Sequence, residues 1–257
     1  MNQLIMLGSG TSNGVPSLGV DYSPDFLANP KNHRTRSSIV IQSGDEALLV
    51  DCSPEMRLQL LREQIKRVDQ VLITHTHADH IMGMDDLRAF CLKSGRAMPI
   101  LARPEHQADI RRIFPYAFED FPPGIEVPRY ELYDVPPQIR CGELEIDTFE
   151  VLHGKTTVVG LRVRDVAYLT DVSEIPPTAW ERLQGLRVLI LDAVRRKPHR
   201  NHFHFDKAVE VALELGAEKT YFTHLSHDYD HDLTEAELPS QIRLAYDGLR
   251  IPLELSA

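Results

Sequence analysis

Short apolar runs bounded by Gly, Ser or Asp recur along the first part of the chain. Each has the length of a β-strand, and the runs are Leu4–Leu7, Ser38–Gln42 and Ala47–Val50. From Pro54 onward the apolar residues fall at helical spacing instead, after a proline and an acidic residue that suit a helix start: Met56, Leu60, Leu61 and Ile65. The pattern predicts a sheet-forming N-terminal half with an amphipathic surface helix over 54–65.

Strand and helix patterns alternate through the rest of the chain. We predict further strands at Val71–Ile73, Pro99–Ala102, Leu144–Val151, Val159–Val163, Ala167–Leu169, Val188–Leu191 and Thr220–Thr223. We predict further helices at Glu105–Ile113, Thr178–Leu183, Asp206–Leu215 and Glu235–Arg243. Six prolines between Phe114 and Pro137 predict an irregular loop there. The length of 257 residues suits one α/β domain over 1–257.

Composition narrows the class of protein. Hydrophobic residues make up 42% and charged residues 26%, as in folded globular chains. The net charge of -10, with no long Lys/Arg run, disfavours a large nucleic acid as partner. The three cysteines, Cys52, Cys91 and Cys141, are far apart and form no C-x-x-C pair, so we expect buried thiols in a reducing compartment. We expect a cytoplasmic protein without membrane contact, because no apolar leader or spanning segment is visible.

The strongest chemical signal is the hexapeptide His75-Thr76-His77-Ala78-Asp79-His80, which follows the apolar run Val71–Ile73. A strand end followed by a tight turn can direct all four ligand-type side chains into one cavity. Imidazole and carboxylate ligands together suit zinc, manganese or iron. Three more candidates, His153, Asp171 and His224, also follow apolar strands, although each alone would more often be structural. The cluster therefore predicts a metal site.

The hexapeptide resembles the signature of the metallo-β-lactamase superfamily, and the later candidates follow in that superfamily's order. They lie in the segments EVLHG, YLTD and YFTHLSH. The resemblance implies a four-layer αββα metallo-β-lactamase sandwich with the site at one edge. It implies two metal ions, one held by His75, His77 and His153 and the other by Asp79, His80 and His224, with Asp171 bridging both.

Charge counting points to the substrate class. Two divalent cations, offset by Asp79, Asp171 and a bridging hydroxide, leave about one positive charge, which favours a monoanionic phosphodiester. The metals would lower the pKa of the bridging water and withdraw charge from the scissile group. We assign catalytic roles to Asp79 and to His202, the latter as general acid, because an imidazole can carry a proton near neutral pH.

A narrower resemblance extends over nearly the whole chain. The opening Gly8-Ser9-Gly10-Thr11-Ser12-Asn13-Gly14-Val15-Pro16, with HRTRSS from His33, VDCSP from Val50 and Arg200-Asn201-His202, resembles the PhnP-type cyclic phosphodiesterases. It implies hydrolysis of a small cyclic phosphodiester, such as a phosphoribosyl 1,2-cyclic phosphate, with His202 as proton donor. The segment 17–36 departs from that family, since it lacks the cysteines that often hold an additional zinc. We therefore expect no such zinc, no such role for His227, and anchoring by Tyr22, Phe26 and Leu27 instead.

The most basic stretch precedes His202 and contains Arg195, Arg196, Lys197, His199 and Arg200. It would either attract substrate phosphates or form a solvated loop. We assign substrate binding to Arg200, Asn201 and His204, with a structural role as the alternative for His204. A small phosphodiester is the expected partner, and a homodimer is an open possibility that the sequence does not decide.

Three rival functions share the histidine cluster. A tRNA 3′-processing endonuclease is disfavoured because only 17 residues separate His153 from Asp171, too few for a long RNA-gripping arm. A glyoxalase II-like thioester hydrolase needs the same hydroxide, but the Arg200-Asn201-His202 segment favours phosphodiesters. A non-catalytic binding module on this fold would tend to lose ligands, whereas all seven candidates are present.

Overall fold

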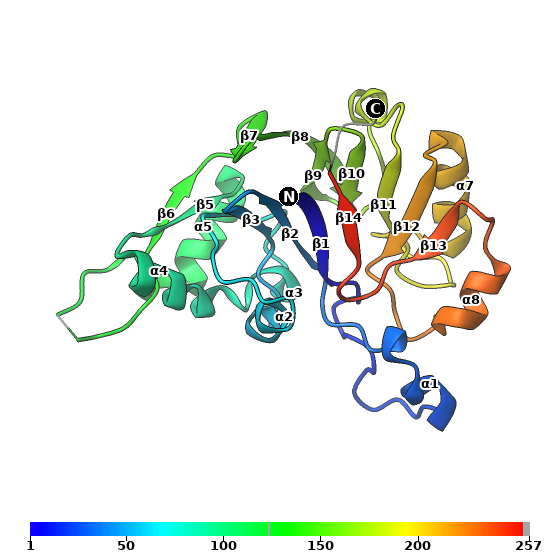
Figure 1. Cartoon of the computed structure of the whole chain (residues 1–257), viewed down its shortest axis with the longest axis horizontal. Coiled ribbons are helices and arrows are strands. Elements are labelled where there is room, and N and C mark those ends of the chain that lie inside the picture. The colour runs from blue at the N-terminus through cyan, green and yellow to red at the C-terminus, as the bar shows by residue number, and fades with distance from the viewer. Residues whose placement is uncertain (123, 254–257) are drawn as a thin grey trace.

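Two β-sheets face each other in the centre of the molecule (Figure 1). The computed structural model describes residues 1–122 and 124–253. Within them, the first sheet has seven strands in the order β14 (Arg250–Pro252), β1 (Asn2–Gly8), β2 (Ser38–Ser43), β3 (Glu46–Val50), β4 (Gln70–Leu72), β5 (Met98–Leu101) and β6 (Tyr130–Tyr133). From β3 to β6 the neighbouring strands are parallel, so their carboxyl ends lie at one edge.

The second sheet also has seven strands in the described residues. Their order is β13 (Ile242–Leu244), β12 (Lys219–Thr223), β11 (Val188–Asp192), β10 (Val166–Leu169), β9 (Thr156–Val163), β8 (Leu144–His153) and β7 (Gln138–Cys141). Strands β10 to β13 are parallel to one another, and β7 to β10 are antiparallel. The strands predicted from the sequence are therefore confirmed, within a few residues at their ends.

Both faces of each sheet are buried, which explains the unbroken apolar runs. In β1, Leu4 and Met6 pack between the sheets, whereas Ile5 and Leu7 pack on the outer face. In β11, Val188 and Ile190 pack between the sheets, and their neighbours pack outward. This alternation fixes the register, because a shift of one residue would exchange the two faces.

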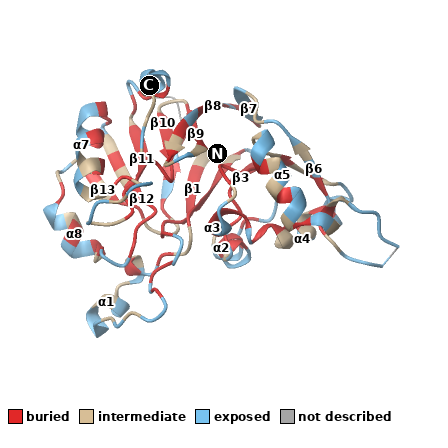
Figure 2. Ribbon diagram, turned by 180° about the vertical axis from the view of Figure 1, so that it is seen from behind, coloured by how far each residue is buried: buried red, intermediate tan, exposed pale blue. Residues whose placement is uncertain are grey.

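Helices cover both outer faces, so the molecule has the four predicted layers, αββα (Figure 2). The first sheet is covered by α2 (Met56–Arg62), α3 (Ala78–Ile81), α4 (Arg88–Ser94) and α5 (Pro104–Ile113), and the second by α6 (Pro177–Arg182) and α7 (Phe205–Leu215). The remaining helices are α1 (Pro24–Ala28), α8 (His231–Glu237) and three 3-10 turns, η1 (Pro30–Asn32), η2 (Met84–Leu87) and η3 (Pro115–Phe118).

The predicted helix Glu235–Arg243 is wrong. Helix α8 begins earlier, where Asp230 caps the backbone N–H of Leu233 at 3.1 Å, and it ends at Glu237. Pro239 cannot continue a helix, and Ile242–Leu244 instead forms strand β13 beside β12.

Two other predictions need correction. Helix α2 ends at Arg62 instead of reaching Ile65, and Leu61 is 64% exposed, so it is not part of the apolar face. The proline-rich stretch between Phe114 and Pro137 also contains regular structure: η3 and the edge strand β6, which pairs with β5. Prolines around a four-residue strand concealed its alternating pattern.

The segment 17–36 projects from the sandwich as an arm that carries α1 (Figures 1 and 2). The ring of Tyr22 stacks on Phe26 at 4.9 Å, and its hydroxyl accepts a 2.7 Å hydrogen bond from the backbone of Ser17. Asn32 donates to Asp230 at 3.0 Å and accepts from the backbone of His231 at 2.7 Å. Tyr22 and Phe26 are anchors as predicted, whereas Leu27 is 42% exposed and is not.

Two expectations from composition bear on the core and on membranes. Cys52, Cys91 and Cys141 are buried free thiols, as predicted. Among residues 1–122 and 124–253, no helix has the length and apolar character that crossing a bilayer requires.

Candidate metal centre

The candidate ligands come from loops at the carboxyl ends of strands in both sheets. His75 and His77 follow β4, and the short helix α3 then carries Asp79 and His80. From the second sheet, His153 ends β8, while Asp171 and His224 follow β10 and β12. The edge where the two sheets meet therefore gathers all seven predicted ligands.

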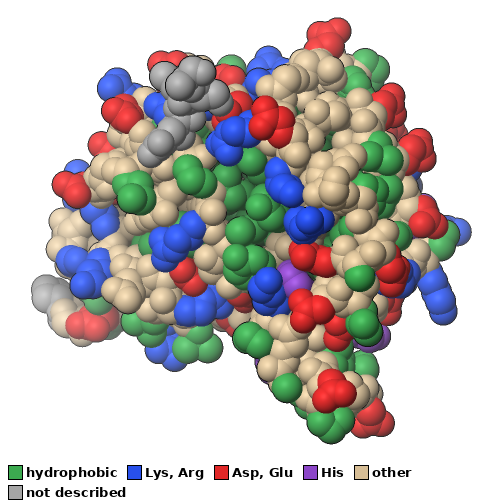
Figure 3. Space-filling view, turned by 45° about the vertical axis from the view of Figure 1, so that its right-hand side comes forward, with side chains coloured by type: hydrophobic (Ala, Val, Ile, Leu, Met, Phe, Trp, Pro, Cys, Tyr) green, Lys and Arg blue, Asp and Glu red, His purple; other side chains and the backbone are tan. Residues whose placement is uncertain are grey.

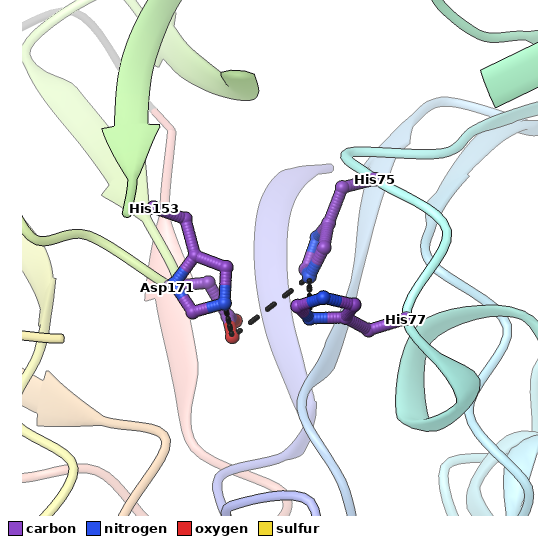
Figure 4. A group of neighbouring side chains, drawn as sticks. All are labelled: His75, His77, His153 and Asp171. Carbon is purple, nitrogen blue, oxygen red and sulfur yellow. Dashed lines mark hydrogen bonds and ion pairs between the residues drawn. The ribbon is translucent and has the colours of Figure 1, made fainter. Parts of the chain in front are cut away.

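The first group of donor atoms consists of His75, His77, His153 and Asp171, which lie within 4.8 Å of one another. His75 and His77 approach from one side and His153 and Asp171 from the other, with their side chains directed at a common centre (Figure 4). The Nε2 atom of His75 lies 3.0 Å from Nδ1 of His77. The Nε2 atoms of His75 and His153 each lie 4.0 Å from Oδ1 of Asp171.

The second group consists of Asp79, His80 and His224. Oδ2 of Asp79 lies 3.3 Å from Nε2 of His80 and 3.4 Å from Nε2 of His224. Asp171 faces this group as well, with Oδ2 at 3.2 Å from His80 and Oδ1 at 3.4 Å from His224. One buried carboxylate thus lies between both groups.

Hydrogen bonds behind the histidines fix which ring nitrogen faces the centre. Nδ1 of His80 lies 2.7 Å from Asp51, and Nδ1 of His153 lies 2.6 Å from the carbonyl oxygen of Asn201. Nδ1 of His75 lies 3.1 Å from the hydroxyl of Thr74, which itself donates to Asp51 at 2.8 Å. With Nδ1 occupied, each ring presents Nε2 to the centre, as in metal sites whose ligands are oriented by a second layer of groups.

Three residues at the centre have left-handed backbone conformations. The φ angles are 63° at Asp51, 54° at Asp171 and 57° at His224. Such conformations are uncommon outside glycine, although Asp, Asn and His adopt them more readily than most residues. Each follows a buried strand, so the turn of the backbone directs its side chain toward the centre at once.

The two groups differ in electrostatics. Burial, followed by the neighbouring His80, holds the pKa of His75 well below its ordinary value, and burial lowers the pKa of His153 to about 4. Burial also opposes protonation of His224, but Asp171, Asp79 and Asp192 raise its pKa to about 9. Burial likewise opposes protonation of His80, yet Asp171, Asp51 and Asp79 raise its pKa well above the ordinary range.

His202 lies beside the centre. Its Nδ1 is 2.8 Å from Oδ2 of Asp192, at the end of β11, and its ring stacks on that of His224 with centroids 4.9 Å apart. The same Asp192 oxygen accepts a 2.8 Å hydrogen bond from the backbone of Val172, next to Asp171. This holds His202 against the second group with Nε2 as its remaining nitrogen.

Sequence reasoning missed Asp192 and Thr74 and did not assign a role to Asp51. Asp51 and Asp192 are single acidic residues at the ends of apolar strands, β3 and β11, where the ligands of the other strands also lie. That shared position was the available signal. It was overlooked because neither residue belongs to a cluster of histidines.

The residues predicted to bind substrate are spread more widely. Arg200 is exposed, and Asn201 lies against the β8–β9 turn, where its carbonyl supports His153. His204 is half-buried at the N-cap of α7, outside both groups of donor atoms and outside a third one formed by Asp171, His202 and His224. In the basic stretch, Arg196 pairs with Glu237 at 2.8 Å and lies 4.9 Å from the ring of Phe205, so its role is structural.

The donor set fits divalent metal ions. The three histidines and one carboxylate of the first group, and the two histidines and two carboxylates facing the second, match ligand types that transition metals prefer. Nε2 of His80 is fully buried, and although Oδ2 of Asp79 and Oδ2 of Asp171 lie 3.3 and 3.2 Å away, neither forms a hydrogen bond of good geometry with it. A cation at the centre would satisfy this nitrogen together with both carboxylates.

Comparison with known proteins agrees with this geometry. Residues 46–225 match the family model described as beta-lactamase superfamily domain. A crystal structure described as a new diphosphatase from the PhnP family is 39% identical, with 99% of each chain covered and a TM-score of 0.90. The human short-form tRNase Z is 19% identical over 98% of this chain and 100% of its own, with a TM-score of 0.70, which shows a shared fold.

Another relative is the octanoyltransferase of Porphyromonas gingivalis, 34% identical over 95% of this chain. The match covers 50% of that protein's length, so its name describes a protein about twice as long as the matched region. The matched family model covers most of the chain, and the related structures have its fold and its arrangement of sheets. The chain therefore belongs to the beta-lactamase superfamily, with the metallo-β-lactamase fold of its metal-dependent hydrolases.

Proposed function

We propose that this chain is a dinuclear metal-dependent phosphodiesterase that hydrolyses a small phosphodiester. The observation that carries the proposal is the position of Asp171, whose two oxygens face both groups of donor atoms at 3.2 to 4.0 Å. His75, His77 and His153 would hold one ion, Asp79, His80 and His224 the other, and Asp171 would bridge them. Zinc and manganese suit these ligands best, with iron as an alternative.

Two divalent ions at this centre would lower the pKa of a shared water toward neutrality and draw electron density from the scissile phosphorus. The chain itself supplies Asp79 and Asp171 to offset the charge of the ions. Once the shared water is deprotonated to hydroxide, the remaining charge is about one positive unit, which matches a monoanionic phosphodiester better than a neutral ester. The proposed catalytic role of Asp79 is accordingly to hold and orient the reacting groups.

His202 is the proposed general acid. Asp192 accepts the Nδ1 proton at 2.8 Å, which leaves Nε2 to carry the proton for the departing oxygen. A carboxylate on the far side of the ring keeps the ring in one orientation. His202 thus supplies the proton for the leaving oxygen, which the metal ligands themselves cannot provide.

A diphosphate linkage is the second candidate bond. The related structure with 39% identity is described as a diphosphatase, and each phosphorus of a substituted diphosphate also bears one negative charge. The same centre and the same acid would serve both bonds. In the diphosphate case the leaving group is a phosphate, which needs less help from a proton than an alkoxide does.

A long RNA is not the proposed substrate, although tRNase Z shares the fold. On the face shown in Figure 3, Lys and Arg side chains are interspersed with Asp and Glu around a band of hydrophobic side chains. A polyanion binds best along a continuous basic track, and the net charge of -10 opposes it further. Small phosphodiesters are less affected by that long-range repulsion.

The test is a parallel assay of the metal-loaded protein. The substrates are a ribose 1,2-cyclic phosphate, a 2′,3′-cyclic nucleotide, a dinucleoside diphosphate and a glutathione thioester. We expect a phosphodiester or diphosphate to be cleaved fastest, and His202→Ala to lower kcat by about 10²-fold or more for a poor leaving group. Preference for the thioester would overturn the bond class, and unchanged kcat in His202→Ala would remove the proposed acid.

A further inference from the structure

A polar recess lies directly beside the first group of ligands. It has a volume of about 410 Å³ and reaches His75 and His77. It is also lined by Thr76, by Glu105, His106 and Asp109 of α5, and by residues 155–157 at the start of β9. We call it the α5 recess, because α5 supplies its two carboxylates. The volume lies within the range typical of small-molecule sites.

The α5 recess offers, next to the candidate ligands His75 and His77, two carboxylates that do not belong to the metal centre. Asp109 accepts from Thr76 at 2.9 Å and from Arg112 at 2.9 Å, and its side chain is 41% exposed. Glu105 is held by Arg103 at 2.6 Å and is 51% exposed. Each carboxylate oxygen can accept a further hydrogen bond. A group in this recess therefore finds most partners if it brings donors of its own.

This chemistry separates two kinds of substrate group. Sugar hydroxyls bring donors that match Asp109 and Glu105. A second phosphate brings only acceptors and negative charge. Lys155 is the one Lys or Arg among the described residues that line the recess. The hydroxyl of Thr156 can donate or accept, whereas that of Thr76 already donates to Asp109 and is left to accept.

We propose that the α5 recess is the subsite for a hydroxyl-bearing, uncharged portion of the substrate, a sugar rather than a second phosphate, and that Asp109 is its main specificity-determining residue. The inference rests on the proposed function, since it presumes a phosphodiester at the centre. It places any second phosphate of a diphosphate substrate away from α5, on the side of His202.

The experiment compares three esters that share the p-nitrophenolate leaving group: ribose 5-(p-nitrophenyl phosphate), pentyl p-nitrophenyl phosphate, and the ribose ester with an additional phosphate on the sugar. We expect the metal-loaded wild type to prefer the ribose ester over both others by at least about tenfold in kcat/KM. Asp109→Asn should reduce that preference to below about threefold, with Glu105→Gln reducing it less.

Asp134→Asn is the matched control. Asp134 accepts a 2.7 Å hydrogen bond from Gln107 of α5 but does not line the recess. It should keep the wild-type preference. Metal content is measured for every variant, so that loss of ions is separated from loss of selectivity. If Asp109→Asn with full metal content lowers all three rates equally, Asp109 acts only through Thr76 and the subsite is refuted.

The outcomes separate this inference from the function beneath it. If the loaded wild type cleaves the esters but prefers the pentyl or the additionally phosphorylated ester, the subsite falls and the phosphodiesterase remains. If it cleaves none of the esters and no substrate of the parallel assay that contains a phosphodiester or diphosphate, the proposed function falls and the subsite with it.

Discussion

The two halves of the candidate metal centre contain similar side chains but lie in different electric fields. His75, His77 and His153 are surrounded mainly by other imidazoles, and burial lowers the pKa of each. His80 and His224 face Asp51, Asp79, Asp171 and Asp192, and their pKa values are raised. At neutral pH the first half already has free lone pairs, whereas the second holds protons that a metal must displace. Similar ligand sets can thus bind metals with different pH dependence.

Asp171→Asn should have the largest effect, because it weakens both halves together. Asn keeps the left-handed backbone at φ 54° but removes the charge that faces both groups. We expect kcat to fall by about 10³-fold or more, since several kcal/mol of charge stabilisation depend on the ions. Metal analysis after dialysis should show fewer than two bound ions. A variant that keeps both ions and its activity would contradict the bridging role.

The pH dependence of metal binding tests the difference between the halves. His224 has a pKa of about 9 in the metal-free fold, so at pH 7 it must release a proton before it binds a metal. We expect the affinity of the second half to rise by at least about tenfold per pH unit between pH 6 and 8, because the proton of His224 is displaced and His80, whose pKa is also raised, adds to the rise. The affinity of the first half should change little, since the pKa of His153 is about 4.

Calorimetric metal titrations in buffers of different ionisation enthalpy measure those protons. The stability of the metal-free protein provides a control, because it should fall with rising pH whereas metal affinity should rise. The folded pKa of His224 lies above its ordinary value of 6.5, so its protonation stabilises the metal-free fold below about pH 6.5. That contribution is lost as the pH rises through about 9. Equal proton release from both halves would refute the comparison.

Asp51→Asn and Asp192→Asn should sharpen the comparison with smaller effects. Both residues end apolar strands and hold an imidazole, at 2.7 Å for His80 and 2.8 Å for His202. Asp51→Asn should weaken metal affinity by about 10- to 100-fold, as is usual for residues that orient a ligand.

Asp192→Asn should leave metal content unchanged and lower turnover of substrates with alkoxide leaving groups by about 10- to 100-fold. The p-nitrophenyl esters serve as its control, because their leaving group needs no proton. Loss of metal in Asp192→Asn would indicate that Asp192 supports His224 instead of acting as the partner of the proposed general acid His202.

Much of the fold could be predicted because sheets buried on both faces leave unbroken apolar runs. The runs around Ile5, Val71 and Ile190 are examples. The four edge strands of the described sheets, β6, β7, β13 and β14, were not predicted, since a strand paired on one side needs fewer apolar residues. The gathering of the seven ligand side chains could be predicted because all follow strand ends.

The residues behind those ligands were harder to predict. Asp51 and Asp192 act through partners that lie 29 and 10 residues away, which no local pattern reveals. The backbone carbonyl of Asn201 holds His153, and a carbonyl has no signature in the sequence. The division of charge between the two halves depends on these groups, so it emerged only from the three-dimensional arrangement.

The left-handed backbone at Asp51, Asp171 and His224 limits how this centre can be redesigned. A cysteine or glutamate introduced at position 171 or 224, in order to recruit a softer or harder ion, would meet a steric penalty before any coordination chemistry is tested. His153 ends an ordinary strand and carries no such restriction. Attempts to change the preferred ion should therefore begin at His153, where a new side chain inherits a relaxed main chain.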